Sequence, residues 1–330
     1  MASDAPYTYE KKQFDPKHVH RRRTMGARPA SDQRAEPAYV YDDDLILAVN
    51  VALATRRPLL VRGPSGGGKS SLARNAADVL GWRFYEYVVT SRTEARDMLW
   101  QVDLLRRLHD AQAASVKGTT LGDDFTPYVK PGVLWWAFEP KTAEWRGAGP
   151  KTAGIQKVDD PSIGKTSDRA VVLVDEIDKA DPDVPNNLLV PLGSLRFQVE
   201  ETGKVVDTDE AHAPLVMITT NEERELPKAF LRRCVEVKIE LPTRGRLLEI
   251  GEAHFPKTGR QVLEQILAAL LGPEDPKSPD ASTELSPAEF IDIVRAVATL
   301  DVPIDEASST WKALSGIVIW KHGRTRTPPA

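Results

Sequence analysis

The stretch GPSGGGKSS, residues 63–71, directly follows the apolar run PLLV and constrains the fold more than any other feature of the chain. It fits the pattern GxxxxGKS, in which glycines let backbone N–H groups curl around phosphate groups. The lysine of that pattern reaches the β- and γ-phosphates and the hydroxyl binds magnesium, roles that fall to Lys69 and Ser70. A glycine-rich turn that merely joins two elements is the alternative, but the junction of a strand and a helix is where phosphate binding requires such a loop. The candidate ligand-binding residues are Gly63, Pro64, Ser65, Gly66, Gly67, Gly68, Lys69, Ser70 and Ser71.

The elements around this loop predict an α/β fold with a parallel sheet. A helix from Lys69 to Gly81 follows the loop, and the β-rich run WRFYEYVVT follows the helix, which together make a βαβ unit. Three further apolar runs have the character of buried central strands: AVVLV before Asp175, PLVMITT before Asn221, and CVEVKIEL from Cys234. With the strand before the loop, the sequence predicts a central sheet of five strands.

Composition along the chain divides it into four parts. Residues 1–38 are polar without a sustained apolar period, which predicts a flexible or extended N-terminal arm, with order beginning at residue 39. Residues 39–241 hold the strands and form the predicted α/β core. Beyond Pro242 the apolar pattern is purely helical, so residues 242–325 are predicted to be a small all-helical domain, followed by a short tail, 326–330.

Overall composition excludes some classes of protein. A chain of 330 residues with 41% hydrophobic residues can bury one large core or two smaller ones, so disorder of the whole chain is excluded. The net charge of −4 gives no general attraction to nucleic acid, and the one basic cluster, HVHRRR at 18–23, is interpreted as part of a solvated arm. With the single cysteine Cys234, no signal peptide and no membrane-length apolar run, a cytoplasmic protein without membrane insertion is predicted.

An acidic pair ends one of the predicted strands, in the string VVLVDEID at 171–178. A strand followed by an acidic turn is common and proves little alone, but the phosphate-binding loop about a hundred residues upstream gives the pair a chemical role. Asp175 would hold magnesium together with Ser70, and Glu176 would polarise the attacking water as a general base.

The string MITTNEERELPKAFLRRC, residues 217–234, supplies a third element: a strand that ends at Asn221, then a short helix that delivers Arg232 and Arg233. With it the chain resembles an AAA+ ATPase over roughly residues 40–325. The strings RPLLVRGPSGGGKSSLA and VVLVDEIDKADPDVPNNLLVPL resemble the MoxR branch of that superfamily.

The resemblance implies ATP and Mg²⁺ as ligands and a homo-oligomeric ring, expected to be a hexamer. It makes Asn221 the sensor 1 residue, which orients the nucleophilic water and reports the γ-phosphate. Arg233 resembles the arginine finger that enters a neighbouring subunit's site, and Arg232 is the competing candidate. Capping of a helix or pairing with nearby acids is the alternative role for both arginines.

Insertions and departures from the family pattern also bear on the prediction. The hairpin expected before sensor 1 is LRFQVEETGKVVD, which alternates around a Thr-Gly turn. Trp135 and Trp136 could contact a pore or a partner, although burial in the core is the favoured interpretation. The glycine loop reads SGGGK where many relatives have Pro-Gly. The string SPAEFIDIVR lacks the usual sensor 2 arginine at the start of its helix and supplies only Arg295.

Three functions follow from the resemblance, in order of preference. The first is a MoxR-like chaperone or remodeller that acts on a partner protein, such as one with a von Willebrand factor A domain. The second is an ATP-dependent switch or scaffold that recruits effectors, for instance in a bacterial conflict or defence system. The third, a nucleic-acid motor, is disfavoured by the acidic charge balance.

A small GTPase is disfavoured because the chain has no NKxD motif. Adenine preference rests on the resemblance alone, in which the base lies near residues 39–44.

Overall fold

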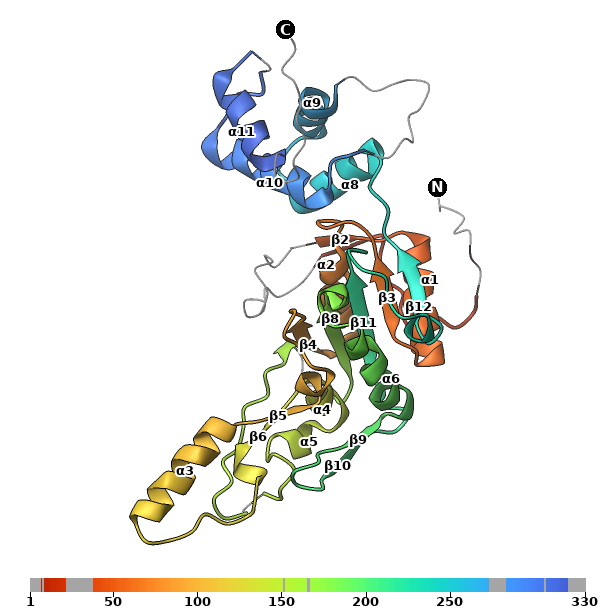
Figure 1. Cartoon of the computed structure of the whole chain (residues 1–330). Helices are drawn as coiled ribbons and strands as arrows, with labels where there is room; N and C mark the ends of the chain where they lie inside the picture. The colour runs from red at the N-terminus through yellow and green to blue at the C-terminus, as the bar shows by residue number, and fades with distance from the viewer. Residues whose placement is uncertain are drawn as a thin grey trace.

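The computed structural model describes residues 7, 9–21, 38–150, 152–164, 167–272, 283–305 and 307–319. Its central sheet has the strand order β12-β3-β11-β8-β4-β7 (Figure 1). These strands are Val235–Lys238 (β12), Leu59–Arg62 (β3), Leu215–Thr220 (β11), Ala170–Asp175 (β8), Arg83–Val88 (β4) and Ile163–Gly164 (β7). The first five are parallel, which confirms the predicted five-stranded sheet. The sixth, β7, pairs antiparallel with β4 at the edge and is too short to leave a sequence pattern.

Helices cover both faces of this sheet, and alternate residues of each strand serve the two faces. Leu59 and Val61 pack with α1 (Asp43–Thr55) and α2 (Lys69–Leu80), whereas Leu60 between them packs with the opposite cluster. That opposite cluster includes α4 (Val133–Phe138) and α6 (Asp183–Ser194). Burial on both faces explains why the parallel strands are continuous apolar runs rather than alternating ones.

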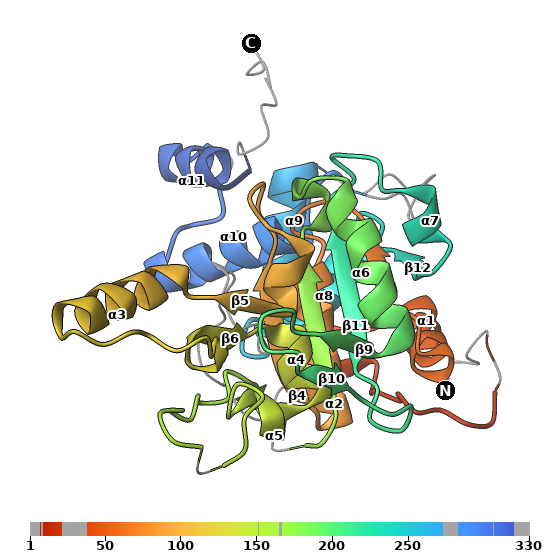
Figure 2. The ribbon, with the colours of Figure 1, turned by 60° about the horizontal axis from the view of Figure 1, so that its bottom comes forward.

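Two insertions extend from the sheet, on the side away from the C-terminal helices (Figure 1). In the first, β5 (Trp100–Val102) pairs antiparallel with β6 (Val129–Pro131), and α3 (Leu104–Val116) between them projects from the body in both views (Figure 2). The second is a hairpin of β9 (Arg196–Gln198) and β10 (Val205–Asp207), as the alternating sequence predicted.

The two insertions pack together through aromatic rings. Phe197 of the hairpin stacks on Trp100 of the first insertion at 5.9 Å between ring centroids, and it meets the edge of Trp135 at 6.2 Å. Trp135 and Trp136 are 0% and 2% exposed. The core interpretation of the two tryptophans is therefore confirmed.

The C-terminal part is all-helical, as predicted, and has a hydrophobic cluster of its own. Its helices are α8 (Arg244–His254), α9 (Arg260–Leu271), α10 (Pro287–Leu300) and α11 (Ser309–Ile319). Phe290 and Trp311 are buried at its centre. The predicted tail, residues 326–330, lies outside the described residues.

Part of the N-terminal arm packs on the core, so ordered structure begins before residue 39. Phe14 is fully buried, and the Asn50 side chain accepts hydrogen bonds from its N–H at 3.0 Å and from that of Gln13 at 2.9 Å. The strand β1 (Val19–Arg21) pairs with β2 (Ala38–Val40). One buried aromatic residue in a polar stretch produces no periodic signal, which explains the difference from the prediction. Residues 22 and 23 of the basic cluster lie outside the described residues.

The remaining short elements connect these parts of the fold. They are η1 (Ala95–Met98), η2 (Thr126–Tyr128), α5 (Pro140–Ala143), η3 (Ile177–Lys179) and α7 (Lys228–Leu231). Among them, η3 follows the acidic pair and α7 precedes the paired arginines, so both lie next to candidate site residues.

Candidate active site

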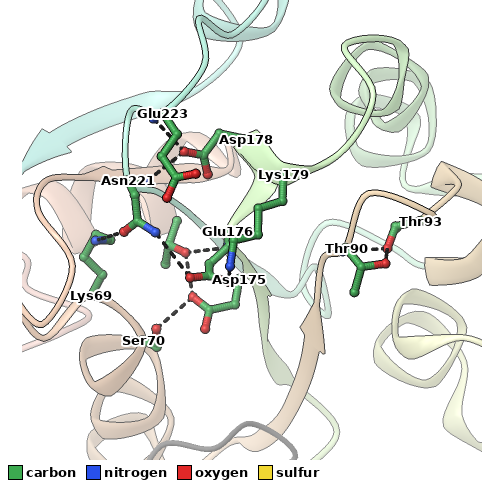
Figure 3. Close-up of polar contacts among 11 residues, drawn as sticks. Lys69, Ser70, Thr90, Thr93, Asp175, Glu176, Asp178, Lys179, Asn221 and Glu223 are labelled. Atoms are coloured by element: carbon green, nitrogen blue, oxygen red, sulfur yellow. Dashed lines mark hydrogen bonds and ion pairs between the residues drawn. The ribbon is translucent and has the colours of Figure 1, made fainter. Parts of the chain in front are cut away.

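Three neighbouring parallel strands, β3, β11 and β8, end at the same edge of the sheet, and each is followed by a polar sequence element. The glycine loop follows β3, Asn221 follows β11, and Asp175 is the last residue of β8. Because carboxyl ends of parallel strands meet at one edge, elements far apart in sequence form one cluster (Figure 3).

The glycine loop leads directly into the N-terminus of α2. Gly66 and Gly68 have φ angles of 76° and 93°, which side-chain-bearing residues rarely adopt. A Cβ atom at position 66 would also lie 2.9 Å from the Ser286 hydroxyl oxygen of the helical domain. The SGGGK sequence therefore places glycine where the backbone requires it at Gly66, whereas Gly67 does not adopt a positive φ.

Lys69 is held inside the loop. Its Nζ donates to the carbonyl oxygens of Gly63 and Pro64, both at 2.8 Å, and to Oδ1 of Asn221 at 2.7 Å. The residue is only 6% exposed, and this burial lowers the pKa of the ammonium, although the nearby acids, with Asp175 the strongest, oppose the shift. An ammonium in this position can exchange carbonyl oxygens for phosphate oxygens without leaving the loop.

The Asp175 carboxylate connects β8 to α2, the helix that follows the glycine loop. Its Oδ1 accepts hydrogen bonds from the Ser70 hydroxyl at 2.7 Å and from the Thr219 hydroxyl at 2.6 Å. Asp175 is 3% exposed, so these contacts lie in the interior. A hydroxyl and a carboxylate oxygen side by side are the hard ligands that Mg²⁺ prefers, and the remaining positions are normally taken by water and phosphate. The donor set therefore fits the magnesium ion assigned to these two residues.

Glu176 has both carboxylate oxygens engaged. Oε1 accepts from Asn221 Nδ2 at 3.2 Å, and Oε2 accepts from Lys179 Nζ at 2.5 Å, a hydrogen bond that raises the pKa of the Lys179 ammonium. The backbone N–H of Glu176 donates to the Thr219 hydroxyl at 2.8 Å. Its φ of 61° is a left-handed conformation that a non-glycine residue adopts at some cost, as is common at functional sites.

Asn221 connects the two halves of the cluster. Its side-chain oxygen faces Lys69 and its nitrogen faces Glu176, so one amide contacts both the lysine of the glycine loop and the candidate base. A residue placed in this way can orient a water molecule between a terminal phosphate and a carboxylate.

Three residues of the cluster were missed by sequence reasoning: Thr219, Asp178 and Lys179. Thr219 is fully buried at the end of β11, and a polar residue two positions before Asn221 in an apolar strand was the available signal. Asp178 contacts the Asn221 backbone, 43 residues away in sequence. No local pattern reveals such a partner.

The paired arginines lie apart from the cluster. Arg232 and Arg233 are exposed, and among the described residues neither forms an ion pair or hydrogen bonds with a residue of the loop or the acidic pair. The Arg57 guanidinium holds their backbone by donating to the carbonyl oxygens of Arg232 at 2.7 Å and Arg233 at 3.1 Å. Among the described residues no acid pairs with these guanidinium groups, and Arg233 Nη1 donates to the Ala229 carbonyl oxygen of α7 at 3.5 Å, a contact at the C-terminal end of that helix.

The helical domain touches the loop at the start of α10. The N–H of Ala288 donates to the Gly66 carbonyl oxygen at 3.2 Å, so an uncharged residue follows Ser-Pro beside the glycine loop. Arg295 lies about 10 Å further along the helix axis and forms an ion pair with Asp292 at 3.1 Å. The structure thus gives this chain no arginine at the start of α10, as the sequence indicated.

Part of residues 39–44, the region expected to hold the adenine base, also lies against the glycine loop. Tyr39 of β2 is within 3.5 Å of the place where a Gly68 Cβ would lie, and burial raises the pKa of its phenol, which stays protonated at neutral pH. An aromatic ring beside the glycine loop offers a flat apolar surface on which a planar ligand group can stack.

One known family matches the part of the chain that carries these residues. Residues 58–234 match the AAA domain of the dynein-related subfamily. This match covers more than half of the chain, so the protein belongs to that family, whose fold is the AAA+ P-loop ATPase core. No curated protein matches the chain. Within the part of the chain that the structure describes, no helix has both the length and the apolar character needed to span a bilayer.

Proposed function

We propose that the chain binds ATP with Mg²⁺ and hydrolyses it. The proposal rests on the convergence of Lys69, Asp175, Glu176 and Asn221 at one edge of the sheet. The loop amides and Lys69 hold the β- and γ-phosphates, and Ser70 with Asp175 holds the metal ion, which supplies charge stabilisation when bound. Glu176 accepts the proton of the attacking water, and Asn221 fixes the orientation of that water.

We further propose a MoxR-like protein that assembles into a ring and remodels or activates a partner protein. The arginines support assembly, because exposed guanidinium groups with a fixed backbone can enter a neighbouring subunit's site. The hydrogen bond between Ala288 and Gly66 supports coupled motion of the core and the helical domain, because a displacement of the glycine loop acts directly on the start of α10. A von Willebrand factor A domain partner is proposed on the sequence resemblance alone.

Replacement of Lys69 by alanine tests nucleotide binding. The variant loses one charged contact to the phosphates, and we expect affinity for ATP to fall roughly 10- to 100-fold. Titration of a fluorescent ATP analogue in the presence of Mg²⁺ measures this loss. The matched control is Lys157→Ala, which removes a lysine that pairs with Glu144 at 3.3 Å outside the cluster. Equal affinities of the Lys69 variant and the control would contradict the assignment.

One observation favours the second candidate, an ATP-dependent switch or scaffold, whereas its place in a bacterial conflict system is proposed on the sequence resemblance alone. Both oxygens of the Glu176 carboxylate are engaged, by Asn221 and by Lys179. While the carboxylate is held in this way, ATP hydrolysis is expected to be slow until a change in the site releases Glu176. Slow hydrolysis suits a protein that uses it as a timer.

Substitution of Lys179 by methionine tests whether this contact restrains the base. Without the ammonium, Glu176 can accept a hydrogen bond from the attacking water. We expect basal ATP hydrolysis to rise about two- to fivefold, which corresponds to the free energy of a partly exposed ion pair. Steady-state phosphate release measures the rate, with Lys157→Met as a control for the loss of a pair of similar exposure. A fall in the rate would show that Lys179 supports the base instead.

A further inference from the structure

The carboxylate of Asp178 is buried beside the turn that carries Asn221 (Figure 3). Asp178 lies in η3 and is 3% exposed. Its Oδ2 accepts two backbone hydrogen bonds, from the N–H of Asn221 at 3.1 Å and from the N–H of Glu223 at 3.0 Å. Its Oδ1 has no hydrogen-bond partner among the described residues. The side chain therefore directs its polar contacts to this one turn.

The turn itself has a conformation that needs support. Glu222, between the two amide donors, has a φ of 61°, and a non-glycine residue in this region is strained by roughly 1 kcal/mol or more. The Glu222 N–H donates to the Thr220 hydroxyl at 3.0 Å, so three successive amides are held by side chains. A charged acceptor binds such amides more strongly than a neutral one does.

We infer that Asp178 is a positioning residue for hydrolysis, acting through Asn221. By fixing the N–H groups on both sides of Glu222, it sets the backbone from which the Asn221 side chain contacts Lys69 and Glu176. Among the described residues, the Asp178 side chain forms no hydrogen bond with Lys69 or Glu176. This inference rests on the proposed function, because it requires Asn221 to act in hydrolysis.

A purely structural role predicts a different outcome from a positioning role. A buried carboxylate that only supports the core would lower stability when removed, and its effect on the rate would combine independently with that of Asn221. A carboxylate that acts through Asn221 has no further effect once the Asn221 side chain is gone, so the two substitutions are not additive.

The test is a double-mutant cycle in the full chain with Asp178→Ala, Asn221→Ala and the double variant. For each protein, kcat and KM for ATP and the thermal midpoint are measured. We expect each single substitution to lower kcat roughly 10- to 100-fold with KM changed less than about threefold. The double variant is expected to be no slower than Asn221→Ala, within about twofold. Asp178→Asn keeps one acceptor oxygen and is expected to recover part of the rate.

Asp160→Ala is the matched control. The Asp160 carboxylate accepts from the Tyr85 hydroxyl at 3.0 Å and from the Ser162 N–H at 2.8 Å, away from the cluster. This control is expected to lower the thermal midpoint without changing kcat. If Asp178→Ala does not fold, the cycle is run with Asp178→Asn.

The results distinguish failure of the Asp178 inference from failure of the proposed function. Full activity of the Asp178 variant beside a slow Asn221 variant overturns the positioning role alone. A double variant slowed by the product of the two single effects overturns it as well. Full activity of Asn221→Ala would overturn the role of Asn221 in the proposed function, and the Asp178 inference with it.

Discussion

Replacement of Glu176 by glutamine is expected to slow ATP hydrolysis by about a thousandfold while ATP affinity stays within about threefold of the wild-type value. Glutamine has the shape of glutamate and keeps an oxygen for the Asn221 amide, but it cannot accept a proton from water. The hydrogen bonds that hold Lys69, Ser70 and Asp175, the residues proposed to bind phosphate and magnesium, do not involve this side chain.

Single-turnover phosphate release gives the rate of the Glu176 variant, and titration with a fluorescent ATP analogue gives its affinity. Glu223→Gln is the matched control, because among the described residues Glu223 donates only its backbone N–H, to Asp178. Hydrolysis at the wild-type rate in Glu176→Gln would disprove the general-base assignment.

Removal of the Arg233 side chain is expected to leave nucleotide binding intact and to lower turnover by about a thousandfold, the scale of an arginine finger. Arg233 is exposed, and its backbone is fixed by Arg57. In the proposed ring its guanidinium stabilises charge at the neighbour's phosphate, so its loss affects hydrolysis and not the subunit's own binding loop.

A mixing experiment shows whether Arg233 acts across an interface. Subunits with Arg233→Ala and subunits with Glu176→Gln are each inactive alone, but a mixed assembly places an intact Arg233 beside an intact Glu176. We expect partial recovery of turnover in the mixture. Arg232→Ala is the parallel variant, and if it alone loses turnover, the finger is Arg232. No recovery in either mixture would contradict a role between subunits.

The sheet could be predicted because burial on both faces leaves a strong sequence signal. Strands β8 and β11 are fully buried, so they are runs of apolar residues that end abruptly at polar ones. The edge strand β7 and the packed Phe14 could not be predicted in this way, because a two-residue strand and a single aromatic side chain have no period.

The candidate site was predictable where one residue type performs one task in a fixed local pattern. The glycine loop, the acidic pair and Asn221 are of this kind. Asp178 and Thr219 gain their roles only from tertiary contacts, since Asp178 binds amides of the Asn221 turn and Thr219 binds Asp175 from the neighbouring strand. Lys179 is three residues from Glu176, but whether the two side chains meet depends on the η3 turn.

The central claim, an ATP site completed between subunits, is tested most directly by the mass of the Glu176→Gln protein in solution with and without ATP and Mg²⁺. The variant should bind ATP without consuming it, so an assembly that depends on ATP persists during the measurement. We predict growth to one defined oligomer, a hexamer, when ATP and Mg²⁺ are present. A protein that binds ATP and remains monomeric would contradict the account.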